Sequence, residues 1–425
     1  MYPITEQLIK YAHADKNNKI GMLILDVKGN YCKEVTRLAQ DFNREDDLII
    51  INLGGNYKYN PLDKPTLKPS VIANQLKEIL LLFSPNNSES FWLDKCQTIL
   101  QEAIKLCRIY NDGYVTFLEL HKLITSEKYY KEKVSFIRDL FVSGKLSKDI
   151  YYDLITAMDF FEKEFLSLDE RNKNILKSEI TRITNPFVSD KEVLDTFCPK
   201  REKLNFKGFY ELVHSGKILV LDMNINEYRS LSKIIAAYLK IDFQTEVLRR
   251  LSSEEKPYRK VAFISDEYSE YVTSLDANFF SQSREANCIN VVATQSYTSI
   301  LNTLKDKYTT EVIIQSLVNK LWFRSDDIYT IESAQKLIGR SNQEFTSKTI
   351  SESAKETSYS YLTNSLRSKN SNLSESFNTS IHKDFIYEVN SFSQDLETFS
   401  AIAFISDGYK ILPPSKIYLK PYFRK

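Results

Sequence analysis

Short apolar runs that end in a polar residue alternate with helical patterns near the start of the chain. Apolar runs cover Gly21–Asp26 and 47–52, and apolar positions at helical spacing cover 3–13 and 35–42. Runs of this length are typical of buried parallel strands, and the intervening helices are long enough for crossover connections. This part of the chain therefore predicts βαβ units of a parallel sheet.

The pattern changes between residues 70 and 205, where strand-like runs almost vanish. Apolar residues recur at helical spacing in several segments: 71–83, 91–107, 129–142, 148–166 and 169–183. Stripes of this kind, including their aromatic residues, are typical of the buried face of a helix. We expect an all-α domain inserted into the α/β domain.

Strand-like runs return after residue 215. A long helix at about 228–251 separates the first of these runs from the second. They lie at 217–222, 260–266, 288–293, 320–323 and 399–405. Six or seven buried strands with helices between them predict a mostly parallel, doubly wound sheet flanked by helices. The expected parts are 1–68 (first part of the sheet domain), 69–205 (helical insert) and 206–425 (remainder of the sheet domain).

One tract within the last part has an unusual composition. Seventeen of the 40 residues in 341–380 are Ser or Thr. Such a tract buries little apolar surface, so we expect a peripheral flexible loop or a solvated helix-turn element.

Composition and charge narrow the class of protein. The chain has 57 Lys and Arg against 56 Asp and Glu, a net charge of +1, and only 10 glycines in 425 residues. This balance excludes a disordered polyelectrolyte and a uniformly basic nucleic-acid coat, although a local basic face remains possible. The glycine count excludes collagen and long Gly-rich linkers.

The spacing of the cysteines does not fit a zinc site, and the apolar stretches are too short for a membrane-spanning helix. The five cysteines form no C-x-x-C pair and the four histidines are dispersed, whereas zinc motifs need closely spaced ligands. Dispersed, odd-numbered cysteines suit a reducing cytosol. The first residues have no apolar signal segment, and no stretch approaches 18 apolar residues, so we expect no transmembrane segment in residues 1–425.

The strongest candidate chemistry follows the strand at 260–266. This apolar run delivers Asp266 and Glu267 in succession, which is the Walker B pattern. At the carboxyl end of a parallel strand, an Asp can hold the water shell of Mg²⁺. The next carboxylate can orient a water toward a γ-phosphate. Two solvated acids after a strand are the alternative interpretation.

Two further residues fit the same chemistry. Gln295 follows the next strand, where its amide can sense a γ-phosphate, and Arg284 precedes that strand, where it can reach a neighbouring subunit's phosphate. Taken alone, each is an ordinary strand-end amide or a solvated charge.

A third candidate segment follows the first strand. Asp26, Lys28 and Gly29 lie in the sequence Asp-Val-Lys-Gly-Asn, where Lys28 could face phosphate or DNA and Gly29 permits a tight turn. A simple strand-to-helix turn is the alternative interpretation.

A phosphate-binding loop of the Walker A type is missing from the sequence. The motif G-x-x-x-x-G-K-[ST] needs Gly-Lys followed by Ser or Thr, and neither Gly144-Lys145 nor Gly216-Lys217 meets that requirement. The sequence therefore contains residues that could hold Mg²⁺ and orient a water, but not the Walker A loop that binds the phosphates.

The ordered set of motifs resembles the TraG/TraD-type coupling ATPases of type IV secretion and conjugation, within the FtsK/HerA-like pumps. The resemblance covers nearly the whole chain. Besides the three candidate segments, it is carried by 59–62, 91–92, 283–284, 323–326 and 337–339.

The resemblance implies a RecA-like sheet with an all-α insert, ATP and Mg²⁺ as ligands, and Asp266 as the residue that holds Mg²⁺ through water. It also implies homo-hexameric rings that transfer DNA or nucleoprotein, with relaxosome and secretion-channel proteins as partners. The expected location is the cytoplasmic side of the bacterial inner membrane.

The front of the chain departs from the family, whose members carry a membrane anchor and a P-loop before the first strand described above. We expect an N-terminally truncated coupling ATPase whose ATP hydrolysis depends on the missing loop. Two alternatives stay open: a non-hydrolysing module that binds DNA or relaxosome partners, and a HerA/FtsK-like DNA pump unrelated to secretion.

Overall fold

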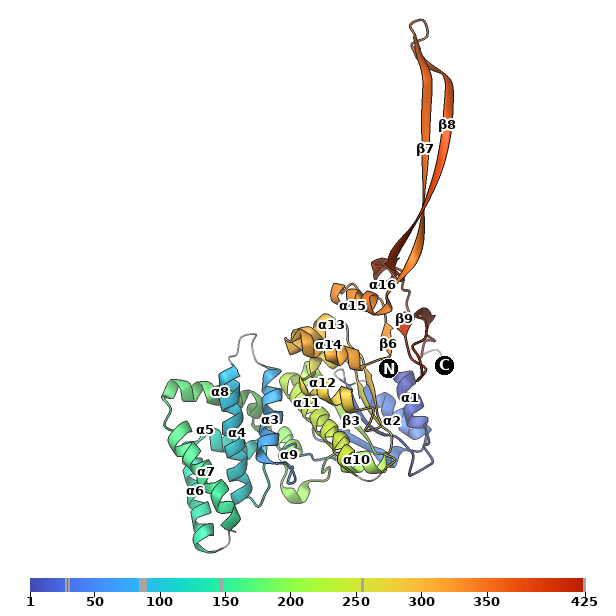
Figure 1. Ribbon diagram of the computed structural model, residues 1–425. Helices are drawn as coiled ribbons and strands as arrows, with labels where there is room; N and C mark the ends of the chain where they lie inside the picture. Colours follow the sequence, from blue (N-terminus) through green and yellow to red (C-terminus); the bar gives the residue numbers. More distant parts are fainter. Residues whose placement is uncertain (27–28, 30, 84–89, 145–147, 254–255, 423–425) are drawn as a thin grey trace. The chain divides into compact units, whose positions relative to one another are not determined.

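The computed structural model describes all residues except 27–28, 30, 84–89, 145–147, 254–255 and 423–425 (Figure 1). Contacts divide the described residues into two compact units, one comprising Met1–Val318 with Tyr422 and the other Asn319–Pro421. The expected boundaries at 68/69 and 205/206 stay a prediction.

The first unit is built on a five-stranded parallel sheet in the order β2-β3-β1-β4-β5. Its strands are β1 (Gly21–Asp26), β2 (Leu48–Ile51), β3 (Ile218–Asp222), β4 (Val261–Ser265) and β5 (Cys288–Val292).

Helices cover both faces of this sheet, because alternate strand residues point to opposite sides. Met22 and Ile24 join a core with α1 and α2, whereas Leu23 and Leu25 join the larger core with α11. The flanking helices are α1 (Tyr2–Lys10), α2 (Tyr31–Asp41), α10 (Tyr210–Ser215), α11 (Ile225–Arg249), α12 (Leu275–Gln282), α13 (Tyr297–Leu304) and α14 (Lys307–Ser316), with short helices η1 (Glu45–Asp47), η4 (Arg250–Ser252) and η5 (Tyr268–Glu270).

A helical insert connects β2 to β3. It shares one continuous core with the sheet: the Phe117 ring packs flat on Phe187 and edge-on against Tyr238 of α11. The expected α/β fold with an all-α insert is therefore confirmed. The insert contains α3 (Pro69–Leu81), α4 (Ser90–Tyr110), α5 (Phe117–Thr125), α6 (Glu127–Val142), α7 (Lys148–Asp159), a π-helical turn η2 (Phe160–Phe165), α8 (Glu170–Val188), α9 (Lys191–Phe197) and η3 (Arg201–Lys203).

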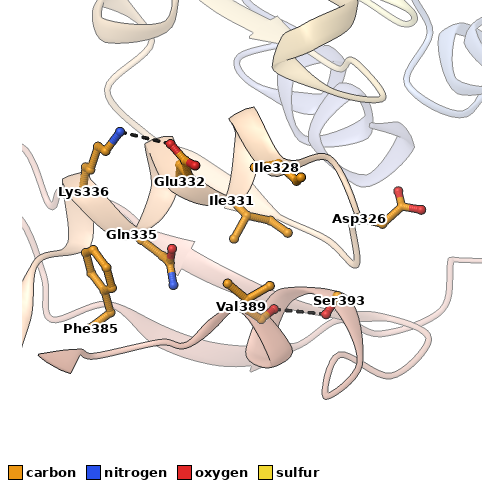
Figure 2. A pocket seen from close by; sticks show the side chains of 9 residues that line it. All are labelled: Asp326, Ile328, Ile331, Glu332, Gln335, Lys336, Phe385, Val389 and Ser393. Atoms are coloured by element: carbon orange, nitrogen blue, oxygen red, sulfur yellow. Dashed lines mark hydrogen bonds and ion pairs between the residues drawn. The ribbon is translucent and has the colours of Figure 1, made fainter.

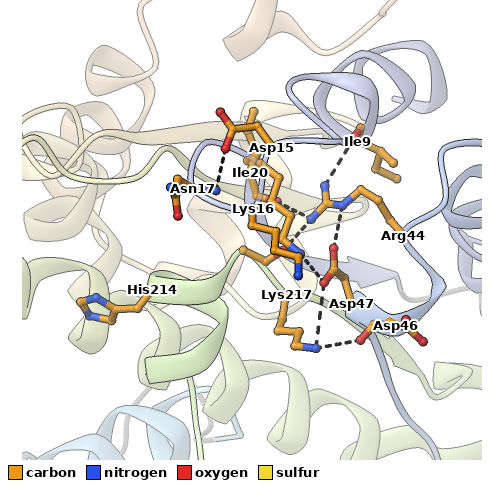
Figure 3. Close-up of polar contacts among 12 residues, drawn as sticks. Ile9, Asp15, Lys16, Asn17, Ile20, Arg44, Asp46, Asp47, His214 and Lys217 are labelled. Atoms are coloured by element: carbon orange, nitrogen blue, oxygen red, sulfur yellow. Dashed lines mark hydrogen bonds and ion pairs between the residues drawn. The ribbon is translucent and has the colours of Figure 1, made fainter.

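Buried ion pairs hold the amino-terminal edge of the sheet together (Figure 3). The Arg44 guanidinium donates to the carbonyl of Ile20 at 3.0 Å and to that of Gly216 at 2.5 Å, so it ties the starts of β1 and β3. Its charge is matched by Asp47 at 3.0 Å, which also pairs with Lys19 at 2.6 Å. This edge is the one opposite the predicted site.

The second unit contains a small antiparallel sheet in the order β10-β9-β6. The strands predicted at 320–323 and 399–405 belong to it, so their expected place in the parallel sheet is wrong. Their apolar runs were strands, but β6 and β9 run in opposite directions. The elements are β6 (Lys320–Trp322), α15 (Ile328–Ile338), α16 (Val389–Ser393), β9 (Ser400–Phe404) and β10 (Ser415–Tyr418).

The Ser/Thr-rich tract forms a two-stranded antiparallel hairpin, β7 (Arg340–Ser360) and β8 (Ser365–Phe385) (Figure 1). The expected loop or helix-turn element is therefore wrong. Backbone pairing along the ladder, rather than apolar burial, orders these residues. Most of the Ser, Thr and Asn side chains that the structure describes in the hairpin are exposed, and they lie on both faces.

A groove of about 540 Å³ lies in the second unit between α15 and α16 (Figure 2). Its floor is apolar, with Ile331 and Val389, and the Lys336 ammonium on its rim bonds to Glu332 at 3.2 Å. None of the predicted site residues lines it.

Candidate functional site

Three parallel strands bring the predicted acids and the predicted amide to one edge of the sheet, and a fourth strand, β3, adds Asp222 there. Asp26 ends β1 and is the direct register partner of Asp222, which ends β3. Asp266 and Glu267 follow β4, and Gln295 follows β5. Ligands of open parallel sheets bind beyond this carboxyl edge.

Backbone hydrogen bonds tie the strand ends together around Asp266. Its N–H donates to the Leu25 carbonyl at 3.1 Å, and the Tyr268 N–H donates to the Ala293 carbonyl at 2.8 Å. Between them, Glu267 has a φ of +49°, the left-handed region that a residue with a Cβ rarely adopts. Strained backbone of this kind is concentrated at functional sites.

Glu267 and Gln295 are in direct contact. The Gln295 side-chain amide donates to both carboxylate oxygens of Glu267, at 3.2 and 3.3 Å. Gln295 is exposed and Glu267 half-buried, so both reach the solvent side of the edge. A carboxylate held in this way by a neighbouring strand has a defined direction in which to accept a water proton.

A fully buried ion pair, which no sequence motif indicated, lies behind this turn. The Lys240 ammonium of α11 meets the Asp276 carboxylate at 2.5 Å, and both side chains have no exposed surface. The same ammonium donates to the Tyr271 carbonyl at 2.7 Å, and the Tyr268 hydroxyl donates to Asp276 at 2.6 Å. Burial lowers the pKa of Lys240, and Asp276 opposes that shift.

Tyr271 connects this buried cluster to the strand ends. Its hydroxyl donates to the Asp266 carbonyl at 2.7 Å and accepts from Ser265 at 3.0 Å. Burial raises the pKa of Tyr271 well above its ordinary value, so the hydroxyl remains a neutral donor. The segment after Glu267 is therefore fixed at both Tyr268 and Tyr271.

The segment after β1 is described in part. The Asp26 carboxylate is buried and accepts a hydrogen bond from the Tyr31 N–H at 2.8 Å, at the start of α2. Gly29 has a φ of +74°, as the tight turn requires. Lys28 lies outside the described residues. Burial, followed by the negative charge of Asp26, raises the pKa of Asp222.

The start of α1 also lies at this edge. The centroid of the Tyr2 ring lies 4.7 Å from that of Tyr31, the residue whose N–H donates to Asp26. Thr5 of the same helix shares a hydrogen bond of 2.8 Å with the Tyr31 hydroxyl of α2.

The structure does not bring Arg284 to the other predicted residues. It lies between α12 and the start of β5, whereas Gln295 lies after the end of that strand. Arg284 is exposed, and the strand between them spans roughly 16 Å at the usual rise per residue. A role at a phosphate of the same chain is therefore not available to it.

The described carboxyl edge is dominated by negative charge. Asp26, Asp222, Asp266 and Glu267 all lie there, so a phosphate ligand would need cations beside it. Within the described ranges, no group of three or more His, Cys, Asp or Glu side chains is arranged to hold a metal ion. One carboxylate acting through water, as expected for Asp266, is the arrangement that Mg²⁺ commonly adopts beside phosphates.

Comparison with known proteins identifies the fold. No protein-family model and no curated protein matches the sequence. Solved structures of the bacterial conjugative coupling protein TrwB match its structure. The trigonal sulphate form has a TM-score of 0.59 at 13% identity over 94% of this chain and 79% of that chain.

Nucleotide complexes of TrwB match to a similar degree. The complex with a non-hydrolysable GTP analogue has a TM-score of 0.58 at 12% identity, and it covers 94% of this chain and 79% of that chain. The complex with ADP and Mg²⁺ has a TM-score of 0.56 at 13% identity, with 94% and 78% covered. The chain therefore has the fold of the conjugative coupling protein TrwB. In the described part of the chain, no helix combines the length and apolarity needed to cross a bilayer.

Proposed function

We propose that the chain is a subunit of a motor ATPase that transfers DNA or nucleoprotein through a type IV secretion or conjugation system. The observation that carries the proposal is the contact between Glu267 and Gln295 at the carboxyl edge, in a chain with the fold of a coupling protein. The expected partners are DNA, relaxosome and channel proteins, and five further copies of the chain in a ring. The expected location is the cytoplasmic side of the inner membrane.

The described residues fit the metal and water half of a nucleotide site. In the proposal Asp266 holds the water shell of Mg²⁺, and Mg²⁺ supplies charge neutralisation at the phosphate oxygens when bound. Glu267 accepts a proton from the attacking water, and Gln295 fixes the direction of its carboxylate. The buried Lys240–Asp276 pair keeps the backbone that carries Glu267 in place.

Asp26, Lys28 and Gly29 are proposed to line the same site from β1. Asp26 already accepts the Tyr31 N–H, so its role is to hold the start of α2 near the nucleotide. Arg284 is proposed to act on the nucleotide of a neighbouring subunit, which agrees with its place at the opposite edge of the sheet. Arginines supplied by a neighbour commonly stabilise phosphoryl transfer.

The test is DNA-stimulated ATP hydrolysis by the chain extended ahead of Met1, either with the residues encoded upstream or with a grafted strand and G-x-x-x-x-G-K-[ST] loop. The proposal expects hydrolysis that depends on Mg²⁺ and rises when single-stranded DNA is added. An extended chain that binds ATP and DNA yet never hydrolyses ATP would contradict it.

A second candidate function is a non-hydrolysing module that binds DNA or relaxosome proteins. The observation that favours it is the lack of a Walker A motif in the sequence. This candidate expects DNA or partner binding that is the same with and without ATP. A HerA/FtsK-like pump would use the same site residues, and the neighbouring genes would distinguish it from a secretion protein.

A further inference from the structure

The β7–β8 hairpin has far more exposed edge than a folded sheet normally leaves open. Each strand has 21 residues, which is roughly 70 Å at the usual rise per residue. In the described part of the chain, the sheet contains these two strands and neither outer edge is paired. Isolated two-stranded hairpins are marginally stable in water, so a third strand would add stability.

The hairpin carries charged side chains, but it lacks two other devices with which proteins block such edges, proline and backbone bulges. Residues 340–385 contain neither proline nor glycine, and both strands pair without interruption of their register. Edge strands that must stay single are commonly short, bulged or interrupted by proline. The two long outer edges are therefore competent to pair with another strand.

One face of the hairpin also leaves apolar side chains uncovered. Ile350, Phe377 and Ile381 lie on the same face and are 57%, 65% and 64% exposed. They alternate with charged residues, so the face is neither a membrane surface nor a basic stripe. The whole hairpin has six basic and five acidic residues, which does not favour nucleic acid as its partner.

On this face, side chains of β7 pair with side chains of β8 of opposite charge or similar kind, so β7 of one copy could make the same pairs with β8 of another. The Lys348 ammonium meets Glu375 at 2.9 Å and lies 5.5 Å from the centre of the Phe377 ring. Beside them, the Thr346 and Thr379 hydroxyls are 3.5 Å apart. If two hairpins point the same way, β7 of one copy lies antiparallel to β8 of the next. The same pairs can then form between copies as within one.

We propose that the hairpin pairs edge to edge with the hairpin of a second copy of this chain, β7 of one copy against β8 of the next. The outer edges would then gain ladder hydrogen bonds, and the exposed apolar side chains would pack against their counterparts. The inference does not depend on ATP chemistry, because no predicted site residue belongs to the hairpin.

The test uses disulfide formation between two differently tagged copies that each carry one new cysteine. Four of the five native cysteines are buried, and the partly exposed Cys198 is replaced by serine in every variant, so that only the new cysteines are accessible for cross-linking. Ser347 of β7 and Asn378 of β8 are register partners on one face. One copy carries Ser347→Cys and the other Asn378→Cys, so neither copy can close the disulfide within itself.

The matched control replaces Asn378→Cys with Thr379→Cys, the next residue, which points to the opposite face. A ring can stagger neighbouring strands by an even number of residues, so Ser376→Cys and Ser380→Cys are also paired with Ser347→Cys. We expect at least one same-face pair to form on the order of tenfold more mixed disulfide than the control, because disulfides need closely placed Cβ atoms.

Three outcomes would overturn the proposal. One is mixed disulfide that is equally low for same-face and control pairs while light scattering shows assembled chain. Another is a chain that stays monomeric at every concentration tested. The third is disulfide that is as abundant in Ser347→Cys homodimers as in the mixed pairs, which would indicate random collision.

Discussion

The buried Lys240–Asp276 pair allows a sharp prediction about stability. Lys240→Met removes the ammonium and leaves the Asp276 carboxylate without a cation in a site with no exposed surface. Asp276 keeps hydrogen bonds from Tyr268 at 2.6 Å and Gln244 at 2.8 Å, but the Tyr271 carbonyl loses its donor. Removing one partner of a buried pair typically costs about 3–5 kcal/mol.

That loss should be visible in thermal unfolding of the first unit. For a unit larger than 250 residues, about 1 kcal/mol lowers Tm by roughly 2 °C, so Lys240→Met should lower Tm by about 6–10 °C. The double variant Lys240→Met, Asp276→Asn keeps an acceptor for Tyr268 and removes the stranded charge. It should recover a large part of the loss.

Lys233 provides a matched control on the same helix. It pairs with Glu270 at the same distance of 2.5 Å, but these side chains are 34% and 39% exposed. Exposed pairs contribute at most about 1 kcal/mol, so Lys233→Met should change Tm little. If Lys240→Met unfolds at the same temperature as Lys233→Met, the reasoning about the buried pair is wrong.

Three further predictions concern nucleotide, subunit contacts and pH. The chain of residues 1–425 alone should show no micromolar binding of ATP in isothermal titration, because no Walker A loop in it supplies phosphate-binding amides; micromolar affinity would contradict this. In the extended, assembled protein, Arg284→Ala should slow turnover, and mixing with subunits that keep Arg284 should restore it; failure of rescue would refute a role across the subunit boundary. Burial lowers the pKa of Lys320 to about 8, whereas an unfolded Lys titrates near 10.5, so this group makes the folded state more stable as pH rises between these values. The free energy of unfolding of the parent minus that of Lys320→Met should therefore increase from pH 7.5 to pH 9, and a flat or falling difference would refute it.

Apolar strands that end in carboxylates were enough to predict the parallel sheet. The strands β1, β3 and β4 are almost wholly buried. An Asp ends β1 and β3 and directly follows β4, so the sequence indicates both the strand and the end of the strand where the site lies. Strand order and direction are not visible in such runs. The residues of β6 and β9 were therefore recognised as strands but assigned to the wrong sheet.

The hairpin could not be predicted by reasoning from burial. The side chains that the structure describes are mostly exposed on both faces, and the sequence lacks the alternation of apolar and polar residues that marks a half-buried strand. Its long ladder of register partners depends on pairing between residues up to 45 positions apart, such as Arg340 with Phe385. Composition alone could not indicate that pairing.

The sequence predicted the polar residues of the site, but not the buried ion pair between Lys240 and Asp276 that holds their backbone in place. Asp266, Glu267 and Gln295 stand at strand ends, where sequence spacing reveals them. Lys240 lies within the apolar run 234–241 of α11, and a lysine inside such a run was the signal available in the sequence. Its partner Asp276 is 36 residues away, and only the fold brings the two together.

The most direct test of the proposed site compares two glutamates of the turn after β4. Glu267 contacts Gln295 at the carboxyl edge, whereas Glu270 pairs with Lys233 of α11. In the extended protein, Glu267→Gln should bind ATP like the parent and lose turnover by roughly 10²–10⁴-fold, the scale of general-base catalysis. Glu270→Gln should hydrolyse ATP like the parent. Turnover at the parental rate in Glu267→Gln would contradict the assignment of this edge as the site of ATP hydrolysis.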